Sequence, residues 1–318
     1  MSMWAMSISP EHLRQKAQIL QNIRAFFAAR NVIEVDAPVL CQAGVTDPYL
    51  DNFSTAFTAT GQPQTYYLQT SPEYALKRML ASGAGDIYAM AKAFRHEPES
   101  PEHNPEFMML EWYRVGWDDR QLMQEVDALL QHILTTPAGD YLAYDEAFAH
   151  YCQLNIWDAS QAELIAAYGR EAQYDLQAES RDHILQLLFA EHIEPHIGQD
   201  KPCFVYDFPA SQAALARIDE THPNKARRFE VYYKGIELAN GYHELTDADL
   251  LQARWLADNA QRQHTGLRPM AFDERLLAAQ RHGLPECAGV ALGVDRLLML
   301  ALGVDTLQDI LSFPFTQA

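Results

Sequence analysis

The sequence has few cysteines, no long apolar run and no basic leader. Four cysteines are present, at positions 41, 152, 203 and 287, and no C-x-x-C pair occurs. That spacing argues against a structural zinc site and against a disulfide framework. No stretch of about 18 apolar residues is present, which disfavours a membrane-spanning helix. The first residues lack a basic head followed by an apolar stretch, so we expect no signal peptide, no membrane partner and a cytoplasmic location.

Basic residues are also scarce. The 318 residues include 24 Lys and Arg against 43 Asp and Glu, for a formal net charge of −19. A broad nucleic-acid surface normally needs a basic footprint, so this charge disfavours one. Neither G-x-G-x-x-G nor G-x-x-x-x-G-K-[ST] occurs. A nucleotide site in this chain would therefore be built without the two common phosphate loops.

What is present favours an α+β fold with a mostly antiparallel sheet flanked by helices. The expected strands are neighbours in sequence and do not alternate regularly with helices. Gly235 and Asn240-Gly241 are expected to bend the 227–245 pair. Strands are expected at 32–38, 64–69, 86–95, 106–116, 202–209 and 227–245. Helices are expected from Ser9-Pro10 to Asn31, from Ser71-Pro72 to Gly83, over most of 118–193, from Thr246, and at 289–303.

The segment 94–113, FRHEPESPEHNPEFMMLEWY, forms the loop and returning strand of one expected hairpin. Arg95 ends the first strand, where its guanidinium could bind a phosphate through two donors. Phe107 and Glu111 lie on the returning strand, where an aromatic ring could support a purine. The alternative is a solvated hairpin with surface ion pairs.

Two further segments carry charge within apolar sequence. Glu230, Glu237 and Glu244 are spaced by seven, and converging carboxylates could bind Mg²⁺ or an ammonium group. A strict two-residue period would place successive members on opposite faces, so the glycine bends would have to restore a common direction. In AGVALGVDRLLMLALG (288–303), Arg296 could reach a phosphate from a glycine-rich helix start. The alternatives are polar edges of a half-exposed sheet and a buried Asp295–Arg296 ion pair.

Taken together, the segments resemble the catalytic domain of class II aminoacyl-tRNA synthetases of the lysyl type, over nearly the whole chain. The first helix with EVDAPVL resembles motif 1 (about 11–38). FRHE…HNPEFMMLEWY resembles motif 2 (about 86–116), and ALGVDRLLM resembles motif 3 (about 288–303). TSPEYALKRML and GIELANGYHEL are similar to lysine-type signatures. The resemblance implies one catalytic domain over 1–318.

The resemblance also implies ATP as a substrate, Mg²⁺, and a role for each matching residue. Arg95 and Arg296 would be the catalytic pair, at the α- and γ-phosphates, and Glu230 and Glu237 would hold Mg²⁺. Other ATP contacts would come from His96, Glu97, His103, Asn104, Phe107, Glu237, Leu238 and Gly293. The amino-acid pocket would be lined by Ser71, Pro72, Glu73, Glu111, Tyr113, Glu244 and Ala291.

One departure from a synthetase narrows the expectation. Few residues precede the first helix, so we expect no N-terminal anticodon-binding domain and no tRNA partner. This form is similar to the stand-alone elongation factor P lysyltransferase family. That likeness implies a ligase that activates (R)-β-lysine, or lysine, and transfers it to a lysine ε-amine of elongation factor P. Motif 1 implies a homodimer.

Two single positions also depart from the synthetase pattern, and two alternative functions remain. Ala291 stands where the synthetase pattern has glycine, and its methyl would narrow the pocket floor. His96 stands in place of the usual asparagine. One alternative is a minimal lysyl-tRNA synthetase that charges tRNA. The other is a non-catalytic amino-acid sensor, although retention of the two arginines and of Glu230 and Glu237 argues against it.

Overall fold

The computed structural model describes residues 4–59, 61–169 and 176–318. Its contacts divide the chain into two compact units, and each is described by itself. The first unit comprises Met1–Trp117 and Leu245–Ala318, and the second comprises Asp118–Glu244. The prediction of one catalytic domain over the whole chain stays a prediction.

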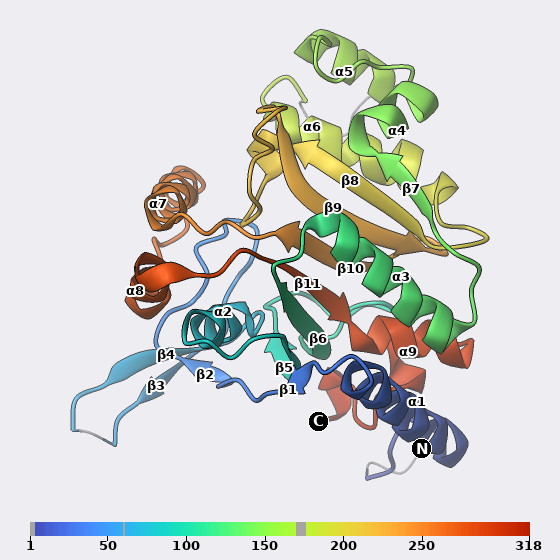
Figure 1. Cartoon of the computed structure of the whole chain (residues 1–318), viewed down its shortest axis with the longest axis vertical. Helices are drawn as coiled ribbons and strands as arrows, with labels where there is room; N and C mark the ends of the chain where they lie inside the picture. The colour runs from blue at the N-terminus through green and yellow to red at the C-terminus, as the bar shows by residue number, and fades with distance from the viewer. Residues whose placement is uncertain (1–3, 60, 170–175) are drawn as a thin grey trace. The chain divides into compact units, whose positions relative to one another are not determined.

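The sheet of the first unit contains the expected hairpin. β5 and β6 pair antiparallel from Ile87 opposite Tyr113 to Phe94 opposite Glu106. β11 adds to β6 antiparallel, and the two-residue β1 pairs with β5 in parallel. The order is β1 (Ile33–Glu34), β5 (Ile87–Phe94), β6 (Glu106–Val115) and β11 (Cys287–Gly293), as Figure 1 shows.

Helices cover both faces of this sheet because successive strand side chains alternate between faces. α1 (Pro10–Ala28) begins at its cap Ser9, as predicted, and its Phe27 ring stacks on Tyr88 of β5 at 4.4 Å. α2 (Glu73–Ala81) covers the other face, where Leu76 and Leu80 pack on Ile87 and Tyr113.

Residues 289–303 do not form one helix, so that prediction was wrong. Cys287–Gly293 is strand β11, and helix α9 (Val294–Leu302) begins only after it. A run of small apolar residues has no periodicity that separates a buried strand from a helix. Asp295 of α9 is buried and accepts a hydrogen bond from the Met108 backbone N–H at 2.8 Å, and its carboxylate lies 3.9 Å from Lys16. These contacts differ from the Asp295–Arg296 pair that the alternative interpretation proposed.

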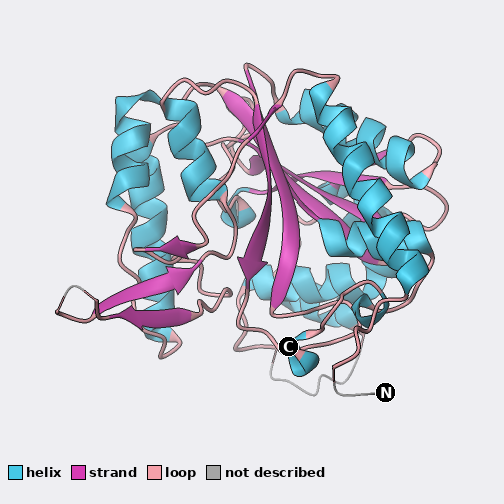
Figure 2. Cartoon of the chain, turned by 90° about the horizontal axis from the view of Figure 1, so that it is seen from below, coloured by secondary structure: helices cyan, strands magenta, loops and turns pink. Residues whose placement is uncertain are grey.

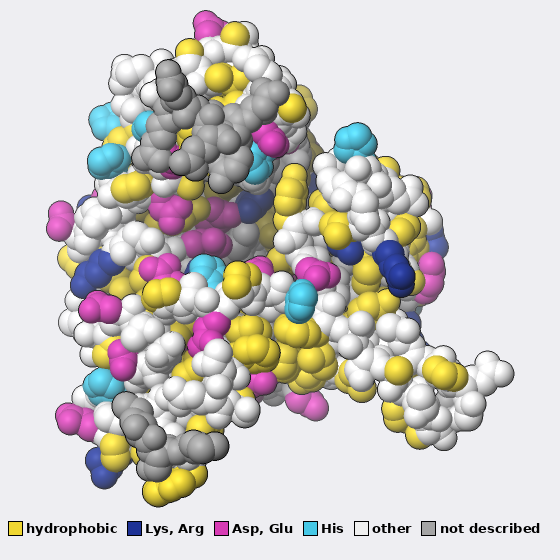
Figure 3. Space-filling model, turned by 180° about the vertical axis from the view of Figure 1, so that it is seen from behind, with side chains coloured by type: hydrophobic (Ala, Val, Ile, Leu, Met, Phe, Trp, Pro, Cys, Tyr) yellow, Lys and Arg dark blue, Asp and Glu magenta, His cyan; other side chains and the backbone are white. Residues whose placement is uncertain are grey.

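Three strands of the first unit form a separate small sheet that we call the arm (Figure 2). Its order is β2 (Leu40–Cys41), β4 (Gln64–Leu68) and β3 (Ser54–Phe57), and β4 confirms the strand expected at 64–69. No charged residue occurs from 52 to 72. Figure 3 accordingly shows the described part of the arm with apolar and neutral polar side chains. Exposed strand edges usually carry charge or proline, so this neutral edge is unusual for so acidic a chain.

The other helices of the first unit follow the arm in sequence. The helix expected from Thr246 begins at Ala248 and is capped by Asp247, whose carboxylate accepts hydrogen bonds from two backbone N–H groups. The arm's preceding loop is tied to this helix, because Thr46 donates to Asp258 at 2.6 Å. The helices are α7 (Ala248–His264), α8 (Glu274–Gly283), η4 (Leu307–Asp309) and η5 (Phe315–Gln317).

The second unit has a four-strand order of β10 (Ile236–His243), β9 (Lys225–Tyr233), β8 (Cys203–Pro209) and β7 (Asp140–Ala143). β7 was not predicted, and it pairs with β8 in parallel. Gly235 turns the chain between β9 and β10 with φ of 74°, as expected. The prediction of a bend at Asn240-Gly241 was wrong, because both residues pair regularly with β9. The irregularity lies instead between Glu237 and Ala239.

The predominantly helical character of 118–193 is confirmed for its described part, and residues 170–175 lie outside the described residues. An apolar cluster packs Phe148, Ile184 and Leu188 against Val205 of β8. The helices are α3 (Asp119–Leu134), α4 (Tyr144–Tyr151), α5 (Gln161–Tyr168), α6 (Arg181–Leu188), η1 (Phe189–Ile193), η2 (Glu194–His196) and η3 (Ala210–Gln212).

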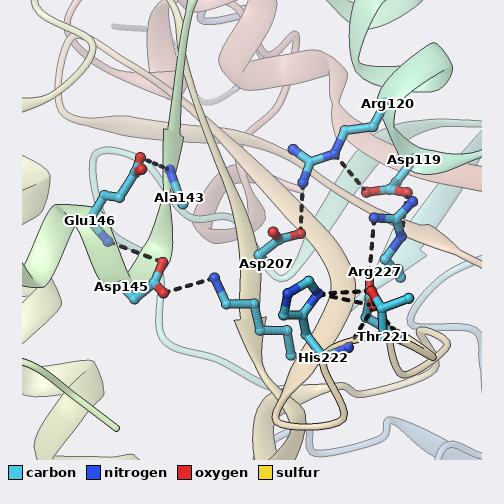
Figure 4. Close-up of polar contacts among 11 residues, drawn as sticks. Asp119, Arg120, Ala143, Asp145, Glu146, Asp207, Thr221, His222 and Arg227 are labelled. Atoms are coloured by element: carbon cyan, nitrogen blue, oxygen red, sulfur yellow. Dashed lines mark hydrogen bonds and ion pairs between the residues drawn. The ribbon is translucent and has the colours of Figure 1, made fainter.

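A buried carboxylate connects α3 to β9 within the second unit (Figure 4). Asp119 is fully buried and lies 3.1 Å from Arg227 Nε and 3.7 Å from Arg120 Nε. Arg120 also pairs with Asp207 at 2.8 Å, and Arg227 pairs with Asp219 at 3.2 Å. Burial raises the pKa of Asp119, and the charges of Arg227 and Arg120 oppose that rise. The contacts form an ion-pair network with Asp119 at its centre.

The predicted α+β class with a mostly antiparallel sheet is confirmed. Within the described residues, no helix has both the length and the apolar content needed to cross a membrane.

Candidate functional site

Arg95 lies just beyond the end of β5, as the sequence predicted. Its guanidinium carbon lies 5.3 Å from the centre of the Phe107 ring on β6. Its Nε atom is buried without a hydrogen-bond partner within the described structure. A buried donor that lacks an acceptor is uncommon in folded proteins, and it is what an anion-binding arginine presents before its ligand arrives.

Arg296 reaches the same loop from the first turn of α9. Its Nη2 lies 2.9 Å from His103 Nε2, and its Nε donates to the Glu102 carbonyl at 3.3 Å. Partial burial and the adjacent charge of Arg296 lower the pKa of His103. The structure therefore brings Arg95, His103 and Arg296 to one loop of the first unit, which the sequence could only propose.

The remaining predicted residues of this loop have other contacts. His96 Nδ1 lies 2.9 Å from Asp51, whose backbone carbonyl also accepts from the His96 N–H. This partner gives His96 a structural explanation that the sequence did not offer. Asn104 donates to the Glu106 carbonyl at 2.5 Å and accepts from the Phe315 N–H at 3.0 Å. Its role at ATP stays a prediction, as does that of Glu97.

The glycine at 293 is not required by packing. Its φ of −72° suits any residue, and a Cβ placed there would lie 3.7 Å from Arg296 Cδ, an ordinary contact distance. Neither the backbone nor the neighbouring side chains therefore require glycine at this position. The ATP contact of Gly293 stays a prediction.

A second group of predicted residues lies where α2 meets β6. The Ser71 hydroxyl donates to Glu111 at 2.5 Å, and the Tyr113 hydroxyl donates to the other oxygen of Glu111 at 2.8 Å. The Glu73 N–H donates to Ser71 Oγ at 3.0 Å. Pro72 is the cap residue of α2 and is buried. The predicted Ser71, Glu73, Glu111 and Tyr113 therefore form one connected cluster.

One residue of this cluster was missed. Lys77 lies one turn after Glu73 on α2, is 1 % exposed, and places its Nζ 2.5 Å from Glu73 Oε1. The spacing of four between Glu73 and Lys77 was visible in TSPEYALKRML and is the usual helical spacing for an ion pair. Sequence alone, however, gave no reason to expect a buried lysine.

The strand register gives Ala291 a place in the same cluster. Ala291 of β11 is directly opposite Glu111 of β6, and Ala89 of β5 is opposite it on the other side. Directly opposite residues share a sheet face, so two methyl groups flank the Glu111 carboxylate. Phe107 lies on this face as well, about 13 Å along the strand from Glu111. One strand face thus presents both the arginine end and the carboxylate end of the site.

The pKa of Glu111 is strongly perturbed. Burial, followed by the nearby charge of Glu73, raises its pKa from 4.5 to about 8, and the hydroxyls of Ser71 and Tyr113 and the charge of Lys77 oppose the rise. At neutral pH the side chain is therefore largely protonated. A carboxyl group held this way can ionise when a cation arrives to compensate its charge.

We expect Glu111→Gln to remove a pH-dependent component of stability. The pKa of Glu111 is about 8 in the folded state against 4.5 ordinarily. The folded state therefore holds a proton that the unfolded state has lost, and the free energy of unfolding falls as pH rises between these values. The component amounts to roughly a few kcal/mol. Urea unfolding from pH 4 to 9 should show a shallower decline for the variant. Glu106→Gln, on the exposed end of the same strand, is the control, and parallel pH profiles for wild type and Glu111→Gln would contradict the assignment.

The predicted carboxylates of the second unit lie on β9, on β10 and just after it. Glu230 accepts hydrogen bonds from Arg228 and Asn240 on one oxygen and from Tyr232 on the other. Asn240 is the strand partner of Glu230, and Glu237 is the partner of Tyr232. The irregularity between Glu237 and Ala239 places Glu230 and Glu237 on one face, which the sequence had attributed to glycine bends. Leu238 and Glu244 are buried.

Glu230 and Glu237, the two predicted Mg²⁺ ligands, differ in their surroundings. Both oxygens of Glu230 are engaged by protein donors, one of them the cation Arg228, so this carboxylate does not fit as a Mg²⁺ ligand in this arrangement. Glu237 is half-buried at the strand end. Across residues 4–59, 61–169 and 176–318, no group of three or more His, Cys, Asp or Glu side chains is arranged to hold a metal. Metal binding by Glu230 and Glu237 stays a prediction.

Comparison with known proteins gives consistent matches over the whole chain. The family model of tRNA synthetases class II (D, K and N) matches residues 5–317. The elongation factor P–(R)-β-lysine ligase of Vibrio vulnificus is 51 % identical over 316 residues, which cover 98 % of each chain. The ligases of the same name from Proteus mirabilis and Vibrio cholerae are each 50 % identical over 319 residues, 99 % of this chain and 98 % of theirs. The match to the family model and the resemblance of the three motifs agree, and this chain belongs to the class II tRNA synthetase family (D, K and N).

Proposed function

We propose that the protein activates (R)-β-lysine with ATP as an aminoacyl-adenylate. It then transfers the β-lysyl group to a lysine ε-amine of elongation factor P. The observation that carries this proposal is the identity of about half of all positions, over nearly the full length of both chains, with ligases named for that reaction. The arginine and carboxylate groups of the first unit supply the chemistry that the reaction needs.

The first step is attack of the amino-acid carboxylate on the α-phosphorus of ATP, with pyrophosphate leaving. Such a displacement needs positioning and charge neutralisation more than a protein nucleophile. Arg95 is proposed to bind the α-phosphate, and Arg296 the γ-phosphate, next to His103. In the second step the ε-amine of the acceptor lysine attacks the adenylate carbonyl, and AMP leaves.

The carboxylates select a substrate that carries ammonium groups. Glu73 and Glu111 provide acceptors for one ammonium group, and Ser71 and Tyr113 fix Glu111 by hydrogen bonds. We extend the amino-acid role to Glu244 of the second unit, as the family resemblance implies. Mg²⁺ usually binds one or two carboxylates together with phosphate oxygens and water, and the family resemblance assigns that role to Glu230 and Glu237.

We further propose a cytoplasmic homodimer that does not act on tRNA. The dimer rests on the motif 1 resemblance, and exposed apolar side chains support it. Ile33 of β1 is 56 % exposed, and Leu13 of α1 is 40 % exposed. The formal charge of −19 disfavours tRNA as the acceptor, because tRNA binding needs basic surface. Light scattering of the purified protein measures its molar mass in solution, which shows whether the protein is a dimer.

The deciding experiment is intact-mass analysis of elongation factor P after incubation with the protein, ATP and (R)-β-lysine. We expect a mass increase of one β-lysyl group that requires ATP. Label from lysine on tRNA, with none on elongation factor P, would favour a minimal synthetase instead. Failure of both lysine and β-lysine to support ATP–pyrophosphate exchange by folded protein would leave the amino-acid sensor.

We expect Ala291→Gly to increase the use of α-lysine relative to (R)-β-lysine. The Ala291 methyl lies on the sheet face beside Glu111, so its removal enlarges the pocket by about one carbon. One carbon in a pocket discriminates by about 1–3 kcal/mol, so kcat/KM for α-lysine should rise roughly 10-fold. Pyrophosphate exchange with each amino acid measures the ratio. Ala89→Gly, on the other side of Glu111, tests whether the effect is specific to 291, and an unchanged ratio in Ala291→Gly would contradict the assignment.

A further inference from the structure

The buried lysine Lys77 lies in the amino-acid cluster without a role in the reaction as proposed. A lysine is almost never fully buried unless it is paired. Here the pair is Glu73, at 2.5 Å on the same helix. Buried ion pairs are often no more stable than apolar residues of the same size, so stability alone is a weak reason for this one.

The charged or titratable groups that act on Glu111 within the described part of the first unit come from α2 and from its own strand. From α2 they are Glu73 and Lys77, and from its own strand the titratable neighbour is Tyr113. Its strand partners Ala89 and Ala291 carry no charge. With both carboxylates ionised, Glu73 and Glu111 carry two negative charges beside the one positive charge of Lys77.

We propose that Lys77 is a positioning residue that holds Glu73 in place and limits this part of the pocket to a single substrate ammonium group. The inference rests on the proposed function and adds a residue to it. Without Lys77, Glu73 loses the partner that orients its carboxylate, and the cluster gains an uncompensated negative charge. Glu73 would then reorient, and an ammonium group would lose a charge-assisted contact.

The test uses Lys77→Met, since Met fills a similar volume without charge. Charge-assisted contacts contribute enough that we expect KM for lysine and (R)-β-lysine in pyrophosphate exchange to rise roughly 10- to 100-fold, with a smaller change in kcat. Because the charge of Lys77 lowers the pKa of Glu111, the pH profile of kcat/KM should also move to higher pH in the variant. Arg78→Met, which removes the neighbouring positive charge of the same helix, should change neither quantity.

A double-mutant cycle separates positioning from general packing. If Lys77 acts through Glu73, then Lys77→Met should add nothing to the KM defect of Glu73→Gln, whereas independent effects would add. The double variant removes both members of the Lys77–Glu73 pair, so it serves where Lys77→Met alone fails to fold. Additive KM effects, or a single variant with unchanged KM and pH profile, would overturn the inference. If the KM of the double variant is clearly higher than that of Glu73→Gln, Lys77 does not act through Glu73, and this result also contradicts the inference.

The inference and the proposed function fail in different ways. Wild-type protein that shows no exchange with either amino acid contradicts the proposed function and this inference with it. Active wild-type protein whose Lys77→Met variant behaves like Arg78→Met contradicts the inference alone.

Discussion

Arg95→Ala should reduce lysine-dependent ATP–pyrophosphate exchange by at least about 100-fold while the protein stays folded. The guanidinium lies over Phe107 at the end of β5, and its buried Nε has no acceptor within the described structure. Removing one preorganised donor at a developing negative charge typically costs about 10²–10³ in turnover. Stability should change little, because among the described residues the side chain contacts the Phe107 ring and forms no ion pair.

Two variants sharpen this expectation. Arg95→Lys keeps the charge but loses the planar fork of donors, so it should recover only a small part of the activity. Arg281→Ala removes an arginine that is 52 % exposed and pairs with Asp249 on the surface of the same unit, and it should behave like wild type. Near-normal exchange by folded Arg95→Ala protein would show that the nucleotide site lies elsewhere.

Local sequence patterns predicted the parts of the site that depend on neighbouring residues. The β5–β6 hairpin, the strand-end position of Arg95 and the cap of α1 were all predicted, because strand alternation and capping residues act over a few positions. The carboxylates Glu73 and Glu111 were named from their motifs, and the structure places them in one cluster. Their positions along the chain were predictable, but their contacts were not.

What the sequence could not predict depends on contacts between distant segments. β11 was predicted as helix because its small residues lack a period, and its strand state is set by pairing with β6. The common face of Glu230 and Glu237 depends on an irregularity after Glu237 that has no glycine. The burial of Lys77 arises from packing of α2 on the sheet. In each case tertiary pairing decided among local states of similar cost.

The ion-pair network around Asp119 in the second unit predicts a large effect on stability. Asp119→Asn should lower the free energy of unfolding by about 2–4 kcal/mol, near the lower end of what breaking a buried ion pair costs. The substituted amide keeps the shape of Asp119 but leaves Arg120 and Arg227 facing each other without the fully buried charge that separates them. Their side chains are 34 % and 23 % exposed, so water and the outer partners Asp207 and Asp219 absorb part of the cost.

Position in the helix can be separated from burial by a matched control. Asp119 lies in the first turn of α3, where an acidic residue also interacts with the helix dipole, and Asp249 lies in the first turn of α7. Asp249 is 91 % exposed and 3.7 Å from Arg281, so Asp249→Asn should cost at most about 0.5 kcal/mol. Urea unfolding at neutral pH measures the free energy of unfolding of both variants.

If the two substitutions lower the free energy of unfolding equally, the helix dipole explains the effect of Asp119 and the buried network contributes nothing. If Asp119→Asn costs several times more, the network stabilises the junction between α3 and the strand that carries Arg227, Arg228 and Glu230. Because Arg227 and Glu230 lie three residues apart on β9, loss of that junction would then also weaken the hydrogen bonds to Glu230.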